Sequence, residues 1–73
     1  MIITNLYKAK KNTIYQIVSA PDTGGLKSLG LKIGTRIEIR NRYIFGGPVL
    51  LKVEDVYYLA LGKALAEHIQ VMV

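Results

Sequence analysis

Residues 35–42 have the sequence Thr-Arg-Ile-Glu-Ile-Arg-Asn-Arg, in which Ile37 and Ile39 alternate with charged side chains. A period of two places the isoleucines on one face of a strand and the charges on the other. The stretch therefore predicts a β-strand with one face in the core and one face in water. We therefore interpret the neighbouring segments starting from this strand.

The residues that follow predict the return strand of a hairpin. Residues 45–48, Phe-Gly-Gly-Pro, offer two glycines for positive φ and a proline that cannot donate to a strand ladder, so we expect them at the hairpin tip. Alternation resumes over residues 49–54 and predicts three core positions. These positions are Val49, Leu51 and Val53. A tight turn at Glu54-Asp55 then leads into another strand over residues 56–61.

Strands are also expected towards both ends of the chain. Residues 13–20 are rich in β-branched and aromatic types, and Asn12 before them favours a left-handed turn. A single helical turn over residues 62–67 precedes a last strand at residues 69–73, which pairs back against the first. About five short antiparallel strands with two helical insertions predict a mainly β protein, a small closed barrel without exposed sheet edges.

The second helical insertion is expected between the first two strands. A Pro-Asp-Thr-Gly-Gly run breaks the first strand, and Asp22 or Thr23 is expected to cap a helix of at most two turns. Leu26 and Leu29, with Leu31 as a further candidate, are expected to pack on the core, and Gly30 to end the helix.

The composition predicts one domain over residues 1–73. The chain is 51% hydrophobic and 21% charged, as in ordered globular proteins, and it has no cysteine for disulfides or thiolate metal sites. A cleft of roughly 300 Å³ or more would empty much of so small a core, so recognition on the surface is expected. The absence of a long apolar run predicts a soluble, cytoplasmic protein with no membrane insertion.

No constellation of residues predicts catalysis or a cofactor. His68 is the only histidine, the serines lack a nucleophile setting, and neither glycine pair belongs to a phosphate-binding motif. The acidic residues do not have the spacing of metal ligands. We therefore expect no catalytic residue, no cofactor and no intrinsic metal site, and a protein that is not an enzyme.

The outer side of the central hairpin is the candidate binding surface. By alternation Arg36, Arg40 and Arg42 share this side, with Tyr43 and Phe45 towards the tip. Arginine and aromatic residues are enriched at binding hot spots, so we predict partner contacts at Arg40, Arg42, Tyr43 and Phe45.

The net charge of +5 indicates an acidic partner. Three lysines, Lys8, Lys10 and Lys11, are interpreted as a solvated approach to the first strand.

Three groups of residues, taken together, resemble the FeoA family of ferrous iron transport proteins. They are the leucine, glycine and isoleucine positions of residues 26–39, the Gly-Pro-Val at residues 47–49, and the apolar pattern of residues 60–71. The resemblance implies an SH3-like barrel and a cytoplasmic role beside FeoB, the membrane ferrous iron permease whose N-terminal domain binds GTP. Related domains occur in metal-dependent repressors of the DtxR type.

The leading hypothesis is therefore an accessory domain that docks on the cytoplasmic part of a FeoB-type permease and modulates transport. The alternative is a basic small barrel that binds single-stranded nucleic acid, with arginines on phosphates and tyrosines on bases. A third hypothesis is stimulation of GTP hydrolysis by an arginine finger, Arg36 or Arg42. The sequence leaves open whether the chain forms a homo-oligomer.

Overall fold

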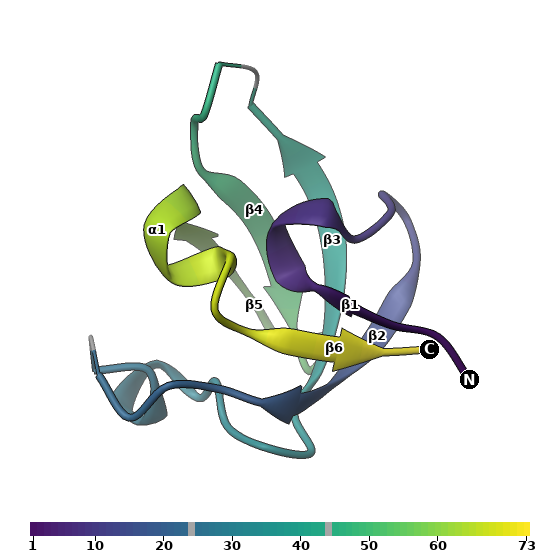
Figure 1. Cartoon of the computed structure of the whole chain (residues 1–73), viewed down its shortest axis with the longest axis vertical. Helices are drawn as coiled ribbons and strands as arrows, with labels where there is room; N and C mark the ends of the chain where they lie inside the picture. Colours follow the sequence, from purple (N-terminus) through teal and green to yellow (C-terminus); the bar gives the residue numbers. More distant parts are fainter. Residues whose placement is uncertain (24, 44) are drawn as a thin grey trace.

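Six short strands form one antiparallel sheet in the computed structural model, which describes residues 1–23, 25–43 and 45–73 (Figure 1). The strands are β1 (Ile3–Asn5), β2 (Ile14–Ser19), β3 (Arg36–Arg42), β4 (Val49–Val53), β5 (Tyr57–Leu61) and β6 (Gln70–Met72). The helical segments are the 3₁₀ turns η1 (Leu6–Lys8) and η2 (Lys27–Leu29) and the short helix α1 (Lys63–Ala66). The strand order is β1-β6-β2-β3-β4-β5.

The predicted mainly β, SH3-like architecture is confirmed, with one strand more than expected. β1 pairs with β6, from Ile3 opposite Met72 to Asn5 opposite Gln70, and the sequence analysis did not find it because three residues show no alternation. β1 ends where Asn5 caps η1, its Oδ1 accepting the Lys8 N–H at 2.9 Å. The predicted pairing of the last strand with the first long one is confirmed as β6 on β2.

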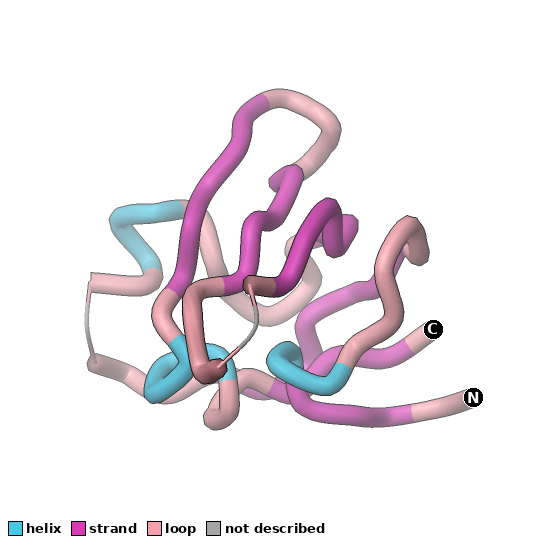
Figure 2. Tube along the Cα trace, turned by 90° about the horizontal axis from the view of Figure 1, so that it is seen from above, coloured by secondary structure: helices cyan, strands magenta, loops and turns pink. Residues whose placement is uncertain are grey.

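The sheet curves around the interior, as the view from above shows (Figure 2). Among the described residues, however, the ladder does not close into the predicted ring, and β1 and β5 remain as edges. The η2 turn lies against β5, because the Tyr57 hydroxyl donates to the Leu29 carbonyl. The η1 turn packs against α1 at the other end of the molecule.

The predicted core positions of the central hairpin are buried. Ile37, Ile39, Val49, Leu51 and Val53 are each no more than 1% exposed. They pack with apolar residues from the other elements, among them Leu6, Ile17, Leu31, Ile69 and Val71. Period-two patterning thus placed the inner face of the sheet correctly.

The turns largely follow the chemistry expected of their residues. Asn12 has the predicted left-handed conformation, with φ of 58°. The turn between β4 and β5 is formed by Glu54 and Asp55 at φ of 51° and 60°. At the hairpin tip positive φ falls on Phe45 and Gly46, where the sequence analysis expected it at the two glycines.

The expected helix before β3 is shorter than predicted, and neither polar residue proposed as its cap makes a capping bond. The N-cap of η2 is Leu26, without a side-chain hydrogen bond, and Gly30 ends the turn at φ of 85°. The Leu31 N–H donates to the Leu26 carbonyl at 2.9 Å, the backbone pattern of a Schellman motif. This bond turns Leu31 into the core, where it is 1% exposed. Leu29 was also expected in the core, but it is 38% exposed.

Gly24, within the predicted break, lies outside the described residues.

Gly30→Ala should lower the free energy of unfolding by about 2 kcal/mol. A non-glycine residue in the left-handed region costs about 1–2 kcal/mol, and the new Cβ would overlap the Tyr57 hydroxyl and displace its hydrogen bond to Leu29. The measurement is the urea midpoint of unfolding. Gly62→Ala is the matched control, because Gly62 has φ of −65° and open space around its Cα. Equal midpoints for the two variants would contradict this account of the turn.

Candidate partner-binding surface on the central hairpin

The β3–β4 hairpin projects beyond the rest of the sheet at the top of Figure 1. Its tip is tied by the Tyr43 N–H, which donates to the Pro48 carbonyl at 3.1 Å. Tyr43 is 48% exposed and Phe45 is 98% exposed. Two of the predicted contact residues thus stand on a projection that two paired strands support.

A β-bulge at Arg40 decides where the arginines of β3 point. Ile39 lies opposite Leu51, but Asn41 lies opposite Leu50, so the register shifts by one residue between them. A bulge adds one residue to a strand and reverses the alternation beyond it. Arg42 consequently lies opposite Val49, a fully buried residue on the core face.

Arg42 is therefore half-buried, and the expectation that it shares the outer face with Arg36 and Arg40 is wrong. Its guanidinium donates to the Ala9 carbonyl and lies 6.0 Å from the centroid of the Tyr7 ring. The Nε of Arg42 is buried with no hydrogen-bond partner among the described residues. Arg42 holds the η1–β2 connection against β3, so it supports the hairpin from behind.

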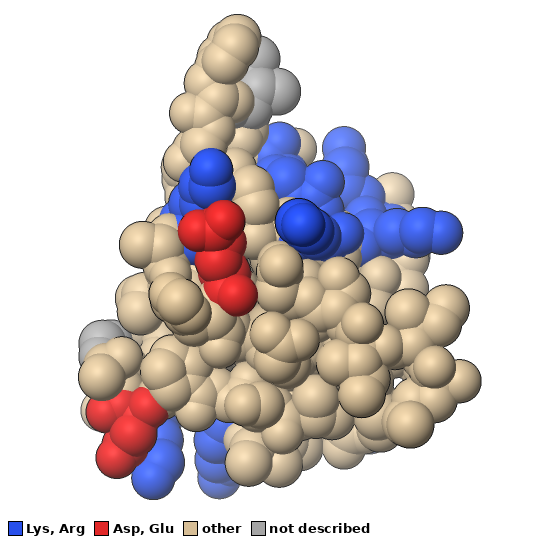
Figure 3. Space-filling view, viewed as in Figure 1, with Lys and Arg blue, Asp and Glu red and all other residues tan. Residues whose placement is uncertain are grey.

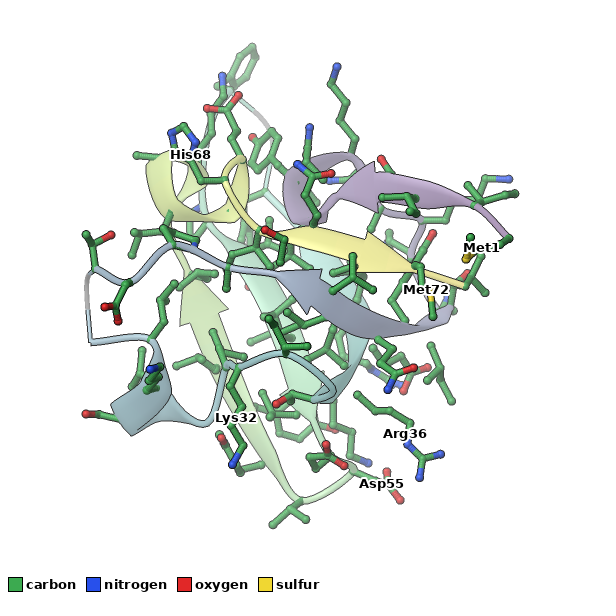
Figure 4. The ribbon with its side chains drawn as sticks, turned by 60° about the horizontal axis from the view of Figure 1, so that its bottom comes forward. Met1, Lys32, Arg36, Asp55, His68 and Met72 are labelled. Atoms are coloured by element: carbon green, nitrogen blue, oxygen red, sulfur yellow. The ribbon has the colours of Figure 1, made fainter. Side chains whose placement is uncertain are left out.

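Arg40 and Arg36 are exposed at different places along the strand. The Arg40 Nη1 lies 3.3 Å from Glu38 Oε1, and Arg40 stands three residues before Tyr43 in the chain. Arg36 stands at the start of β3, about 20 Å from the strand's far end at the usual rise per residue. Figure 4 shows it beside Asp55, away from His68. The structure thus groups Arg40, Tyr43 and Phe45 at one end and places Arg36 at the other.

Two of the grooves on the described surface are large enough to hold a small ligand. One, of about 350 Å³, lies beside Arg36 and is lined by side chains of β2, β3 and the β4–β5 turn. There the Lys52 Nζ lies 3.0 Å from Asp55 Oδ1, and its hydrogen bond and charge attraction to Asp55 raise the pKa of Lys52. The other, of about 380 Å³, lies beside Pro21 and Ile33. Both open to the surface, although the core residues Ile37 and Leu31 each line one of them, so clefts of the size not expected from the sequence are present as open grooves.

Within residues 1–23, 25–43 and 45–73, no three of the histidine and carboxylate side chains gather closely enough to hold a metal ion. His68 is exposed just after α1 (Figure 4). In the same residues no helix is long and apolar enough to cross a membrane.

The sheet order and the projecting hairpin define a small SH3-like domain, and comparison with known proteins identifies its family. The family model described as the FeoA domain matches residues 4–73, so the chain belongs to the FeoA family. Family membership supports a role in ferrous iron transport. FeoA is a family of small accessory domains and is not known as an enzyme family.

Solved structures show the same fold over nearly the whole chain. A crystal structure of an iron uptake regulatory protein, FeoA, has a TM-score of 0.86 and 25% identity, covering 99% of this chain and 97% of that one. A FeoA-like protein from Clostridium acetobutylicum has a TM-score of 0.82 and 23% identity, covering 100% and 88%. Comparison with curated proteins finds no match.

The fold also occurs inside a larger protein. A manganese-dependent transcriptional repressor matches with a TM-score of 0.84 and 17% identity, over 96% of this chain and 41% of the repressor. At this identity the likeness concerns the fold alone.

Arg42→Ala should destabilise the domain by about 1–3 kcal/mol, because the buried Ala9 carbonyl loses a charged donor. Arg40→Ala, on the same strand, should change stability by less than about 0.5 kcal/mol, since its ion pair with Glu38 is partly exposed. Chemical unfolding of both variants measures the difference. If Arg40→Ala proved the more costly, the assignment of the two arginines to opposite faces would be wrong.

Proposed function

We propose that this protein is a cytoplasmic accessory component of ferrous iron uptake that binds the GTP-binding cytoplasmic part of a FeoB-type permease and modulates transport by contact. The observation that carries the proposal is the projecting hairpin with exposed Arg40, Tyr43 and Phe45, in a chain of the FeoA family. Family membership suggests association with the iron transport machinery. The permease as the specific partner is our inference.

The hairpin offers the residue types that make strong contacts at protein interfaces. Two aromatic rings supply apolar area with few rotatable bonds, and the Arg40 guanidinium can bind a carboxylate through two parallel hydrogen bonds. The intramolecular pair with Glu38 costs little to exchange, because both groups are solvated. Arg42 has an indirect part in this proposal, since it holds the support of the hairpin in place.

Modulation by contact requires a difference in affinity between two states of the partner. A domain that bound the GTP and GDP forms of the permease equally well would not change the equilibrium between the two forms. A tenfold preference for one form corresponds to about 1.4 kcal/mol. The proposed function therefore entails unequal dissociation constants for the two nucleotide forms.

The double variant Arg40→Ala with Tyr43→Ala should weaken binding to the isolated cytoplasmic domain of the permease by at least about tenfold, because it removes two hot-spot side chains. Isothermal titration calorimetry measures the change. The matched control is Arg36→Ala with Tyr58→Ala, which removes the same residue types from exposed positions on the same sheet.

If the control weakened binding as much as the hairpin variant, the contact would lie elsewhere on the sheet. If neither variant nor the wild-type protein bound the permease domain in either nucleotide form, the proposed function would fall.

A further inference from the structure

Lysine side chains gather at the end of the molecule that carries the hairpin tip. Lys8 ends η1, Lys10 and Lys11 follow it, and Lys63 begins α1; all four are exposed. The sequence pattern predicts an ordinary solvated segment for the first three and does not indicate a role for Lys63. The fold brings them together from segments more than 50 residues apart in the sequence.

Contacts within the described residues fix this arrangement. The Lys63 Nζ lies 5.5 Å from the centroid of the Tyr7 ring, and the Lys63 stem passes the hairpin at Gly46, whose added Cβ would stand 3.7 Å from Lys63 Cδ. The Asn12 N–H donates to the Ile39 carbonyl at 2.7 Å and holds the lysine segment against β3. Figure 3 shows Lys and Arg side chains on both sides of the base of the projecting hairpin.

No lysine of this cluster forms an ion pair within the described residues. The ion pairs there join Lys27 to Asp22, Arg40 to Glu38 and Lys52 to Asp55, and none includes a lysine of the cluster. Glu67, the C-cap of α1, follows Lys63 by four residues and is the acidic residue closest to it in the sequence. Like charges repel within the Debye length, so a group of exposed lysines favours an anionic partner.

Phe45 adds an apolar group beside the cations. Its ring is 98% exposed at the tip, and its backbone has φ of 59°, a conformation that is unfavourable for a non-glycine residue. An aromatic side chain held outward on a projection, with lysines around its base, has the composition of surfaces that bind lipid headgroups and insert a ring at the interface.

The aromatic residues behind the lysine cluster are not available to nucleobases. The Tyr7 ring is flanked by Arg42 and Lys63, and Tyr15 is buried, its hydroxyl accepting the Lys10 N–H at 2.9 Å. A single-stranded nucleic acid would need a row of open aromatic faces along the cationic surface, whereas the exposed rings of Tyr43 and Phe45 lie at the hairpin tip. Lysines are also compact charges on flexible stems, suited to a diffuse anionic surface more than to one paired carboxylate.

We propose that the lysine cluster, Lys8, Lys10, Lys11 and Lys63, together with the Phe45 ring, docks this protein on the surface of an anionic lipid bilayer. The lysines lie among the headgroup phosphates, and the Phe45 ring enters the interface at the edge of the protein contact formed by Arg40 and Tyr43. The docking needs no permease, so it goes beyond the proposed function and is tested without it. With a permease present, it would concentrate the domain at the membrane surface.

The test is co-sedimentation of the full chain with vesicles of phosphatidylcholine alone or mixed with phosphatidylglycerol. Binding should require the anionic lipid and weaken with salt. Each lysine near such a surface contributes about fivefold, so the triple variant Lys8→Glu, Lys10→Glu, Lys11→Glu should bind at least about a hundredfold more weakly. The matched control is Lys27→Glu, Lys32→Glu, Arg36→Glu, which changes the net charge equally at exposed positions outside the cluster.

A second variant tests insertion of the tip. The chain has no tryptophan, so Phe45→Trp provides a single reporter at an exposed site. Its emission should shift to the blue with the anionic vesicles and stay unchanged with phosphatidylcholine alone. Phe45→Ser, which keeps the charge, should lower vesicle binding by about tenfold.

Three results would overturn the proposal. They are equal losses for the two triple variants, absence of wild-type binding to anionic vesicles, and tighter binding of a labelled single-stranded oligonucleotide than of the vesicles at the same salt concentration. Titration of the lysine triple variant with the isolated permease domain keeps the two proposals apart. The lysine triple variant should still bind the permease domain while its binding to vesicles is lost. The Arg40 and Tyr43 double variant should still bind vesicles while its binding to the permease domain is lost.

Discussion

The pairing of β3 with β4 is the constraint on which the rest of the structure depends. This ladder carries five of the most deeply buried side chains, and each of its two strands pairs with a further strand of the sheet. Its single irregularity, the bulge at Arg40, separates the two roles of the hairpin. Before the bulge alternate side chains fill the core, and beyond it Arg42 turns inward while Tyr43 and Phe45 remain at the tip.

In this chain of 73 residues the described part buries fifteen apolar side chains in one cluster, so most of its polar and charged groups lie on the outside. The packed interior is needed for stability, because a domain this small hides only about 60% of the surface of its unfolded chain. Both proposals accordingly concern surfaces. They differ in the forces used: directed contacts of Arg40 and Tyr43 with a protein, and diffuse attraction between lysines and an anionic layer.

The two proposed surfaces meet at Phe45 and share one support. Arg42 and Lys63 both lie near the Tyr7 ring, so η1, α1 and the end of β3 form one packed unit behind the tip. A change in this unit would alter the hairpin and the lysine cluster together. Tyr7 and Arg42 belong to neither proposed contact, yet both support the two surfaces from behind.

The sequence by itself determined the strands with regular alternation, the inner face of the central hairpin, the left-handed turn at Asn12 and the resemblance to the FeoA family. These features are local, because period-two patterning and turn chemistry act between residues close together in the chain. It also placed Arg40, Tyr43 and Phe45 near one another, since they are neighbours on one hairpin.

Only the tertiary structure decided the pairing of β1, the exposure of Leu29, the inward turn of Arg42 and the gathering of Lys63 with the η1 lysines. Each of these depends on a partner distant in the chain or on one backbone irregularity. A strand of three residues is too short to show alternation, so β1 is recognised only from its pairing with β6. A single bulge reverses the alternation of side chains beyond it, so the face on which Arg42 lies could not be predicted from the pattern.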